Sequence, residues 1–147
     1  MHELELEFEL DSQIKADTHA LGNFPLSSLR LMNDAQYPWL MLVPRRKGVT
    51  EIYHLSTDDQ IQLMRETSAL AQAMSDLFPT TKMNVANLGN RVAQLHVHVI
   101  ARHQSDPAWP DPVWGKLPTV PYTEEALEQV VNRLDALLTG EVSFLPE

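Results

Sequence analysis

The first half of the chain alternates short apolar runs with turn residues, a pattern typical of strands. Residues 26–32 and 39–43 are two such runs, and Asn33-Asp34-Ala35-Gln36 forms a turn between them. Pro44 ends the second run, and Gly22-Asn23 with Pro25 marks an earlier turn. The short link between the two runs predicts an antiparallel pair of strands.

A long helix is predicted next. Ser56 is a candidate N-cap, and Asp58 and Asp59 lie in the first turn, where the helix dipole favours acidic residues. Apolar or small residues then recur at helical spacing up to Pro79, at Leu63, Thr67, Leu70, Met74 and Leu77. This stripe predicts a helix that packs one face on the core.

Two further strands, a loop and a last helix follow. Residues 82–88 and 93–102 read as strands around a turn at Gly89-Asn90, and residues 105–121 read as an ordered loop rich in Pro, Asp and Trp. The last helix is expected over about residues 123–139, with Gly140 as its C-cap.

The N-terminal segment is less regular. Residues 3–10 alternate Glu with Leu or Phe, which is compatible with a strand or with a disordered arm, and Asp11 is a candidate cap for a short helix up to residue 17.

Together these elements predict an α+β fold. Strands that come in runs, joined by short turns, favour an antiparallel sheet of about five strands, with one long helix and a C-terminal helix. The length of 147 residues fits a single domain over residues 1–147.

Composition narrows the possible classes of function. Hydrophobic residues make up 44% of the chain, and no window holds ~18 consecutive apolar residues, so we expect no membrane-spanning helix. Cysteine is absent, which excludes thiolate metal sites and a Cys nucleophile and suits the cytoplasm. The net charge of −9 opposes binding to a nucleic acid polymer, so a phosphate-bearing ligand needs a local site.

The stretch Gln94-Leu95-His96-Val97-His98-Val99-Ile100 carries the candidate chemistry. Because side chains alternate along a strand, Gln94, His96 and His98 are expected on one face. Three interpretations remain open from spacing alone: a chance pattern, two ligands of a Zn²⁺ or Fe²⁺ site, or a histidine nucleophile with hydrogen-bonding neighbours. No acidic residue follows nearby to complete a metal site, although His54, His103 and Asp106 lie elsewhere in the chain.

This stretch resembles the histidine triad signature, His-φ-His-φ-His-φ-φ, with Gln in place of the first His. Asn87-Leu88-Gly89 resembles the Asn-x-Gly that precedes the triad strand, and Leu40-Met41-Leu42-Val43-Pro44-Arg45 resembles a strand ending in Val-Pro-Lys or Val-Pro-Arg. The resemblance covers roughly residues 24–115. Residues 108–115 resemble a bacterial subgroup described as diadenosine tetraphosphate hydrolases.

The resemblance implies a sheet continued across a homodimer, and reaction at the α-phosphate of a nucleotide. His96 would be the nucleophile that forms a nucleotidyl-histidine, and His98 would contact the phosphate and help to protonate the leaving group. Gln94 would support the site. The expected substrate is a dinucleoside polyphosphate or a nucleoside phosphoramidate, with no required cofactor and no metal in the covalent step.

The resemblance also implies a set of binding residues. Asn87 matches the residue that contacts the α-phosphate region, and Asn33 matches the residue that binds the ribose hydroxyls. Gly89, Asn90 and Arg91 would supply further phosphate contacts, because the loop is shorter than usual in the family. Where the family has a His before the second core strand, this chain has Trp39.

Several residues keep more than one interpretation. Trp109 and Trp114 could line a purine pocket, pack on the sheet or contact a partner subunit. Arg45 and Arg102 could steer phosphates or be solvated charges. Two alternatives to the enzyme remain: a non-catalytic nucleotide-binding module, and a metal-dependent hydrolase that uses His96 and His98 as ligands.

Overall fold

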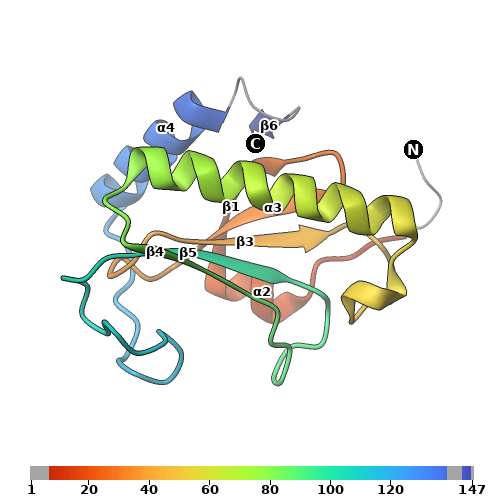
Figure 1. Cartoon of the computed structure of the whole chain (residues 1–147), viewed down its shortest axis with the longest axis horizontal. Helices are drawn as coiled ribbons and strands as arrows, with labels where there is room; N and C mark the ends of the chain where they lie inside the picture. The colour runs from red at the N-terminus through yellow and green to blue at the C-terminus, as the bar shows by residue number, and fades with distance from the viewer. Residues whose placement is uncertain (1–6, 139–143, 147) are drawn as a thin grey trace.

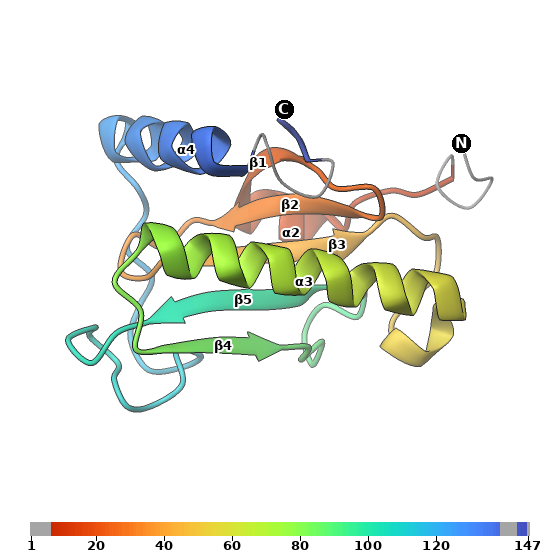
Figure 2. The same cartoon turned by 45° about the horizontal axis from the view of Figure 1, so that its top comes forward.

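The computed structural model describes residues 7–138 and 144–146. Its centre is an antiparallel sheet in the order β4-β5-β3-β2-β1-β6. Helix α3 crosses one face of this sheet and α2 lies on the other face, while α4 lies beyond β1 (Figures 1 and 2). The α+β class is therefore confirmed.

The central strands follow the predicted apolar runs closely. Strands β2 (Ser27–Met32) and β3 (Trp39–Pro44) pair in antiparallel register, and β5 (Val97–Arg102) joins the other side of β3 so that Met41 lies opposite His98. Strand β4 (Lys82–Ala86) is the edge strand beyond β5. Strand β5 starts at Val97, not at residue 93, so Gln94 and His96 precede the strand.

The sheet has two strands that the pattern did not predict. Strand β1 (Thr18–Asn23) pairs with β2, and the short β6 (Leu145–Pro146) pairs with β1. The sequence pattern predicted a turn at Gly22. Instead, this glycine lets the chain of β6 approach closely, because a Cβ atom there would collide with the backbone of Leu145 and Pro146. The described sheet therefore has six strands where about five were expected.

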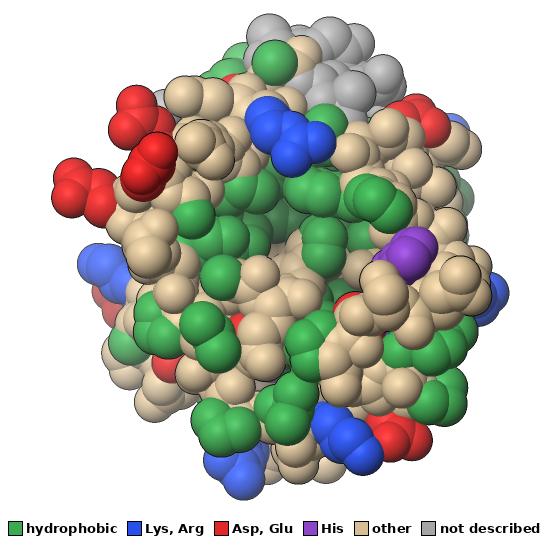
Figure 3. Space-filling model, turned by 90° about the vertical axis from the view of Figure 1, so that its left-hand side faces the viewer, with side chains coloured by type: hydrophobic (Ala, Val, Ile, Leu, Met, Phe, Trp, Pro, Cys, Tyr) green, Lys and Arg blue, Asp and Glu red, His purple; other side chains and the backbone are tan. Residues whose placement is uncertain are grey.

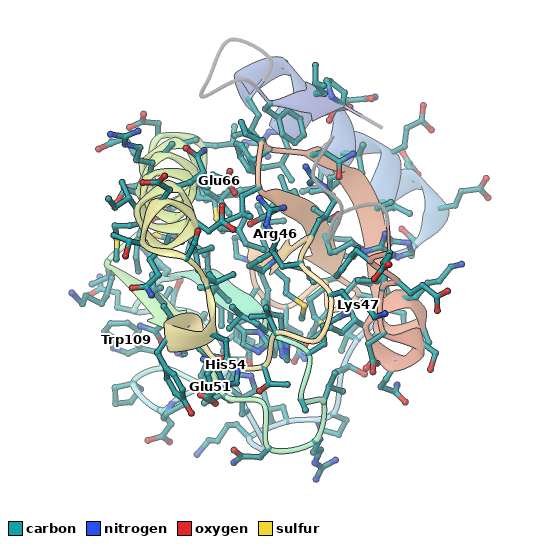
Figure 4. The ribbon with its side chains drawn as sticks, turned by 90° about the vertical axis from the view of Figure 1, so that its right-hand side faces the viewer. Arg46, Lys47, Glu51, His54, Glu66 and Trp109 are labelled. Carbon is teal, nitrogen blue, oxygen red and sulfur yellow. The ribbon has the colours of Figure 1, made fainter. Side chains whose placement is uncertain are left out.

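Helix α3 (Thr57–Leu77) begins and ends as predicted. The Ser56 hydroxyl accepts the N–H of Asp59 at 3.1 Å. The buried Glu66 carboxylate accepts the N–H groups of Leu26 and Ser27 at 2.8 and 3.0 Å, which ties α3 to the turn between β1 and β2. Figure 4 shows Glu66 on the side of α3 that faces the sheet.

The two faces of the sheet bury different clusters. Helices α3 and α4 (Glu124–Leu138) cover the main core, which includes Leu29, Leu40, Leu42, Val97 and Val99. The intervening residues of β3, Met41 and Val43, point to the opposite face and pack against Ile14 of α2 (Ser12–Asp17). The predicted cap is confirmed, because the Asp11 carboxylate accepts the N–H groups of Gln13 and Ile14. Gly140 lies outside the described residues.

Apolar side chains also reach the surface. Figure 3 shows a group of them around a hollow on the side of the molecule that lies at the left in Figure 1. Other large apolar residues are exposed elsewhere: Ile61 and Met64 in the first half of α3, Val85 on β4, and Tyr53 in the 3-10 turn Ile52–His54. None of the helices within the described ranges is long and apolar enough to span a membrane.

Candidate active site

A cavity of about 310 Å³ lies on the α2 side of the sheet and contains both histidines of the motif. Met32 of β2, Met41 of β3 and His98 of β5 form its floor, because these residues share the sheet face opposite α3. The remaining lining residues come from α2, from the loop after β4 and from the loop after β5: Ile14, Asp17, Leu88, Gly89, Asn90, Arg91, Val92, His96 and Trp114. The lining is mostly apolar with a few polar groups, which is typical of a small-molecule site.

A hydrogen bond to the backbone sets the tautomer of His96. Its Nδ1 lies 2.7 Å from the carbonyl oxygen of Gln94. Because a carbonyl oxygen only accepts, Nδ1 must carry the proton. The neutral ring therefore keeps a lone pair on Nε2. His96 is buried, with only 6% of its surface exposed, and it lines the cavity.

His98 has the opposite tautomer. The indole N–H of Trp39 donates to its Nδ1 at 3.0 Å, so a neutral His98 carries its proton on Nε2. Burial lowers the pKa of His98 from 6.5 to about 4, with a smaller contribution from the charge of nearby His96. The ring centroids of His96 and His98 are 4.9 Å apart. When both rings are neutral, the pair thus combines an acceptor nitrogen, Nε2 of His96, and an N–H donor, Nε2 of His98.

The loop after β4 forms one rim of the cavity. Gly89 has a φ of +83°, which a residue with a Cβ rarely adopts, and this conformation turns the chain so that residues 88–92 line the cavity. Arg91 and Asn90 are the exposed polar members of this rim. Gly89, Asn90 and Arg91 are therefore brought together with His96 and His98 as expected.

Two expected binding residues lie elsewhere. Asn33 follows β2, where its side-chain oxygen accepts the N–H of Tyr122 at 3.0 Å, and the described cavity lining does not include it. Asn87 immediately precedes the rim but does not line the cavity itself. Asp17, at the end of α2, is an acidic lining residue that sequence reasoning missed, since only the packing of α2 brings it to the site.

Gln94 does not line the cavity with the two histidines. Its side-chain amide donates to the carbonyl of Glu9 at 2.8 Å and accepts the N–H of Asp11 at 2.9 Å. The expected alternation is nevertheless kept. Leu95, Val97 and Val99 belong to the main core on the α3 side, whereas the Gln94 side chain contacts the segment before α2 on the opposite side.

Two tryptophan rings lie beside His98. Trp114 lines the cavity, and its ring centroid lies 5.2 Å from His98 and 5.9 Å from Trp39. Trp109 instead lies near the guanidinium of Arg102. The two tryptophans therefore have different surroundings, and Trp114 is the one at the cavity.

The two arginines considered for phosphate steering are engaged elsewhere. Arg102 is 1% exposed and makes a bidentate ion pair with Asp106 at 2.7 and 3.0 Å. Arg45 donates to the backbone carbonyls of Phe24 and Pro25. Arg102 is thus a buried structural residue and not a solvated charge.

No group of three or more His, Cys, Asp or Glu side chains that could hold a metal ion occurs within residues 7–138 and 144–146. The Nδ1 atoms of His96 and His98 are both occupied by hydrogen bonds within the protein.

Comparisons with known proteins agree with this geometry. The family model described as the HIT domain matches residues 13–105. A histidine triad protein from Marinobacter aquaeolei VT8 is 53% identical with a TM-score of 0.88, over 90% of this chain and 97% of that chain.

Two further crystal structures are similar. A histidine triad protein from Bradyrhizobium japonicum is 41% identical with a TM-score of 0.87, over 89% of this chain and 98% of that chain. A histidine triad protein from Sinorhizobium meliloti 1021 is 40% identical with a TM-score of 0.88, over 91% of this chain and 99% of that chain. No curated protein matches the chain.

Proposed function

Because the chain belongs to the histidine triad family, whose members typically bind nucleotides and include hydrolases and transferases, we propose that it hydrolyses or transfers a nucleotidyl group through a covalent bond to His96. The observation that carries this proposal is the hydrogen bond from Nδ1 of His96 to the Gln94 carbonyl. When the buried ring is neutral, this bond leaves the lone pair on Nε2, as a nucleophile requires.

The reaction would proceed in two steps. In the first, Nε2 of His96 attacks the α-phosphorus, an N–P bond forms, and the bond from phosphorus to the leaving group breaks. The leaving group takes up a proton. In the second, water attacks the same phosphorus, the N–P bond breaks, and the lone pair returns to Nε2. Water releases the proton that balances the first step.

His98 would act first as a hydrogen-bond donor. With a pKa of about 4 it is neutral at pH 7, and its Nε2–H can donate to a phosphoryl oxygen. Transfer of a proton to the leaving group needs the cationic ring, so it requires a bound anionic phosphate that raises the pKa of His98. This proposal therefore makes protonation by His98 dependent on substrate binding.

The nucleoside would occupy the apolar part of the cavity, and the phosphate would lie at the rim. Met32, Met41 and Trp114 offer apolar surface for a base, while Gly89, Asn90 and Arg91 offer donors for phosphate oxygens. Asn87 and Asn33 remain candidates for contacts that form only with ligand bound.

Charge favours a substrate with one phosphate. The described lining holds one cationic side chain, Arg91, and one acidic side chain, Asp17, beside the two histidines. A polyphosphate chain would bring several negative charges to a protein with a net charge of −9. We therefore favour a nucleoside phosphoramidate or a similar monophosphate derivative over a dinucleoside polyphosphate.

We also propose that the chain forms a homodimer through β4. This strand pairs only with β5 among the described strands, so one edge has free backbone groups. Val85 on β4 is 50% exposed, and Ile61 and Met64 on α3 are exposed as well. Sedimentation of the wild type and of Val85→Glu tests this: the wild type should be a dimer and the variant a monomer, and a monomeric wild type would refute it.

Turnover and trapping test the function. The wild type should release AMP from adenosine 5′-phosphoramidate, and acid-sensitive label from an α-³²P substrate should remain on the protein after a rapid quench. His96→Ala should lose both, whereas His54→Ala, a change at an exposed histidine, should retain both.

Other results of these assays would support one of the alternative functions or exclude His96 as the nucleophile. Binding of AMP without turnover by the wild type would support a non-catalytic nucleotide-binding module. Activity that a chelator removes and Zn²⁺ restores would support a metal-dependent hydrolase. Turnover by His96→Ala at the wild-type rate would remove His96 from the mechanism.

A further inference from the structure

The segment before α2, residues 7–11, packs along the wall of the cavity, and we call it the N-terminal arm. Phe8 and Leu10 pack against the cluster of Ile14, Met41 and Val43. Glu7 and Glu9 are exposed. The apolar residues of the alternating pattern therefore pack inward and the acidic ones face solvent, although residues 8–11 form no strand. The exposed Glu7 forms an ion pair of 3.1 Å with Lys47, a residue that Figure 4 shows on the side of the molecule where α2 lies.

The Gln94 side chain is the polar anchor of this arm. Its amide N–H donates to the Glu9 carbonyl, and its amide oxygen accepts the Asp11 N–H. A primary amide suits this role because it offers a donor and an acceptor side by side and does not titrate. A histidine at this position would lose its acceptor nitrogen when protonated, and the Asp11 N–H would then lack a partner.

The arm is connected to the cavity through α2. Asp11 caps α2 through its carboxylate, and α2 contributes Ile14 and Asp17 to the cavity lining. On the other side, the backbone carbonyl of Gln94 accepts the Nδ1–H of His96. Gln94 thus contacts both the arm that supports the wall and the proposed nucleophile.

We propose that Gln94 is a positioning residue, which holds the N-terminal arm and α2 in the arrangement that binds the nucleotide. This proposal rests on the proposed function. The side chain does not touch the reacting atoms, so its loss should weaken nucleotide binding and leave the chemical step nearly unchanged. We expect Gln94→Ala to raise KM and the Kd for AMP about tenfold, with kcat within twofold of the wild type.

The experiment compares the full-length wild type, Gln94→Ala and Gln94→His, with Gln104→Ala as a control for loss of an exposed glutamine. Amide hydrogen exchange over residues 7–14 measures the attachment of the arm, and titration with AMP measures binding. Gln94→Ala should lose protection in these residues, while α3 keeps its protection as evidence that the variant is folded. In Gln94→His, residues 7–14 should be protected at pH 8 and should lose this protection near pH 5.5. The exchange rates are corrected for the intrinsic effect of pH and compared with those of the wild type at each pH.

Two results would overturn the proposal. One is unchanged protection of residues 7–14 in Gln94→Ala, which would mean that the apolar contacts alone hold the arm. The other is a fall in kcat with unchanged KM, which would mean that Gln94 acts on the chemical step. If the wild type shows no turnover and no AMP binding, the proposed function fails, whereas the exchange comparison still decides whether Gln94 anchors the arm.

Discussion

The stability of the protein should fall steeply below neutral pH because His98 is buried as the neutral imidazole. Burial lowers its pKa from 6.5 to about 4 in the folded state, while the unfolded chain keeps the ordinary value. Between these two values the unfolded state binds a proton that the folded state does not. The stability contributed by neutral His98 is therefore fully present above pH 6.5 and is lost as the pH falls towards 4.

The size of the effect follows from the pKa difference. One pKa unit corresponds to ~1.36 kcal/mol, so a shift from 6.5 to about 4 corresponds to about 3 kcal/mol, a large part of the stability of a typical domain. His98 is 4% exposed and accepts the Trp39 N–H, so little water is available to solvate its cation.

Urea unfolding at pH 7, 6, 5 and 4 measures this contribution. The wild type also titrates carboxylates and other histidines, so the relevant quantity is the difference between its pH dependence and that of His98→Asn. Asparagine retains an oxygen that can accept the Trp39 N–H, but it does not titrate. We expect the free energy of unfolding of the wild type to fall by about 3 kcal/mol more than that of His98→Asn, whereas His54→Asn should follow the wild type. Parallel curves for the wild type and His98→Asn would refute the reasoning.

Three further changes have defined outcomes. Trp39→Phe removes the N–H that donates to Nδ1 of His98 and so holds the ring in place. We expect kcat to fall about tenfold with the Kd for AMP unchanged, and an unchanged kcat would contradict this. Gly89→Ala places a Cβ at a φ of +83° and should destabilise the fold by ~1–2 kcal/mol in urea unfolding and raise KM, whereas equal stability would show that the loop relaxes. Glu66→Ala leaves the N–H groups of Leu26 and Ser27 without their acceptor and should cost ~1–3 kcal/mol for each group, measured by thermal unfolding, with Glu66→Gln less affected.

The central part of the fold could be predicted because its signals are local. Ser56 caps α3 and Pro79 follows its end, and the apolar run of β3 was recognised as a strand that ends at Pro44. Strand β1 was missed because Gly22 reads as a turn residue when only its neighbours in sequence are considered. Its role depends on contact with β6, about 120 residues later in the chain.

The sequence predicted the two histidines and the rim of the candidate site, but not the residues that other elements bring to it. His96 and His98 lie together at the cavity, and residues 89–91 form its rim, as the motif and the Gly-containing turn indicated. The positions of Asp17 and Trp114 depend on how α2 and the loop after β5 pack on the sheet. Trp39 was noted only as a replacement for a histidine, and its hydrogen bond to His98 became evident from the pairing of β3 with β5.

The sequence by itself determined the class of fold, the pair of histidines and the family, because apolar periodicity, caps and motif spacing depend on residues close together in the chain. Only the tertiary structure decided which nitrogen of each imidazole carries the proton, since this depends on the Gln94 carbonyl and on the Trp39 indole. It also decided the orientation of the Gln94 side chain, which binds the backbone of residues 9 and 11 and does not line the cavity. Hydrogen-bond partners distant in sequence fix tautomers and side-chain directions, and no local pattern records them.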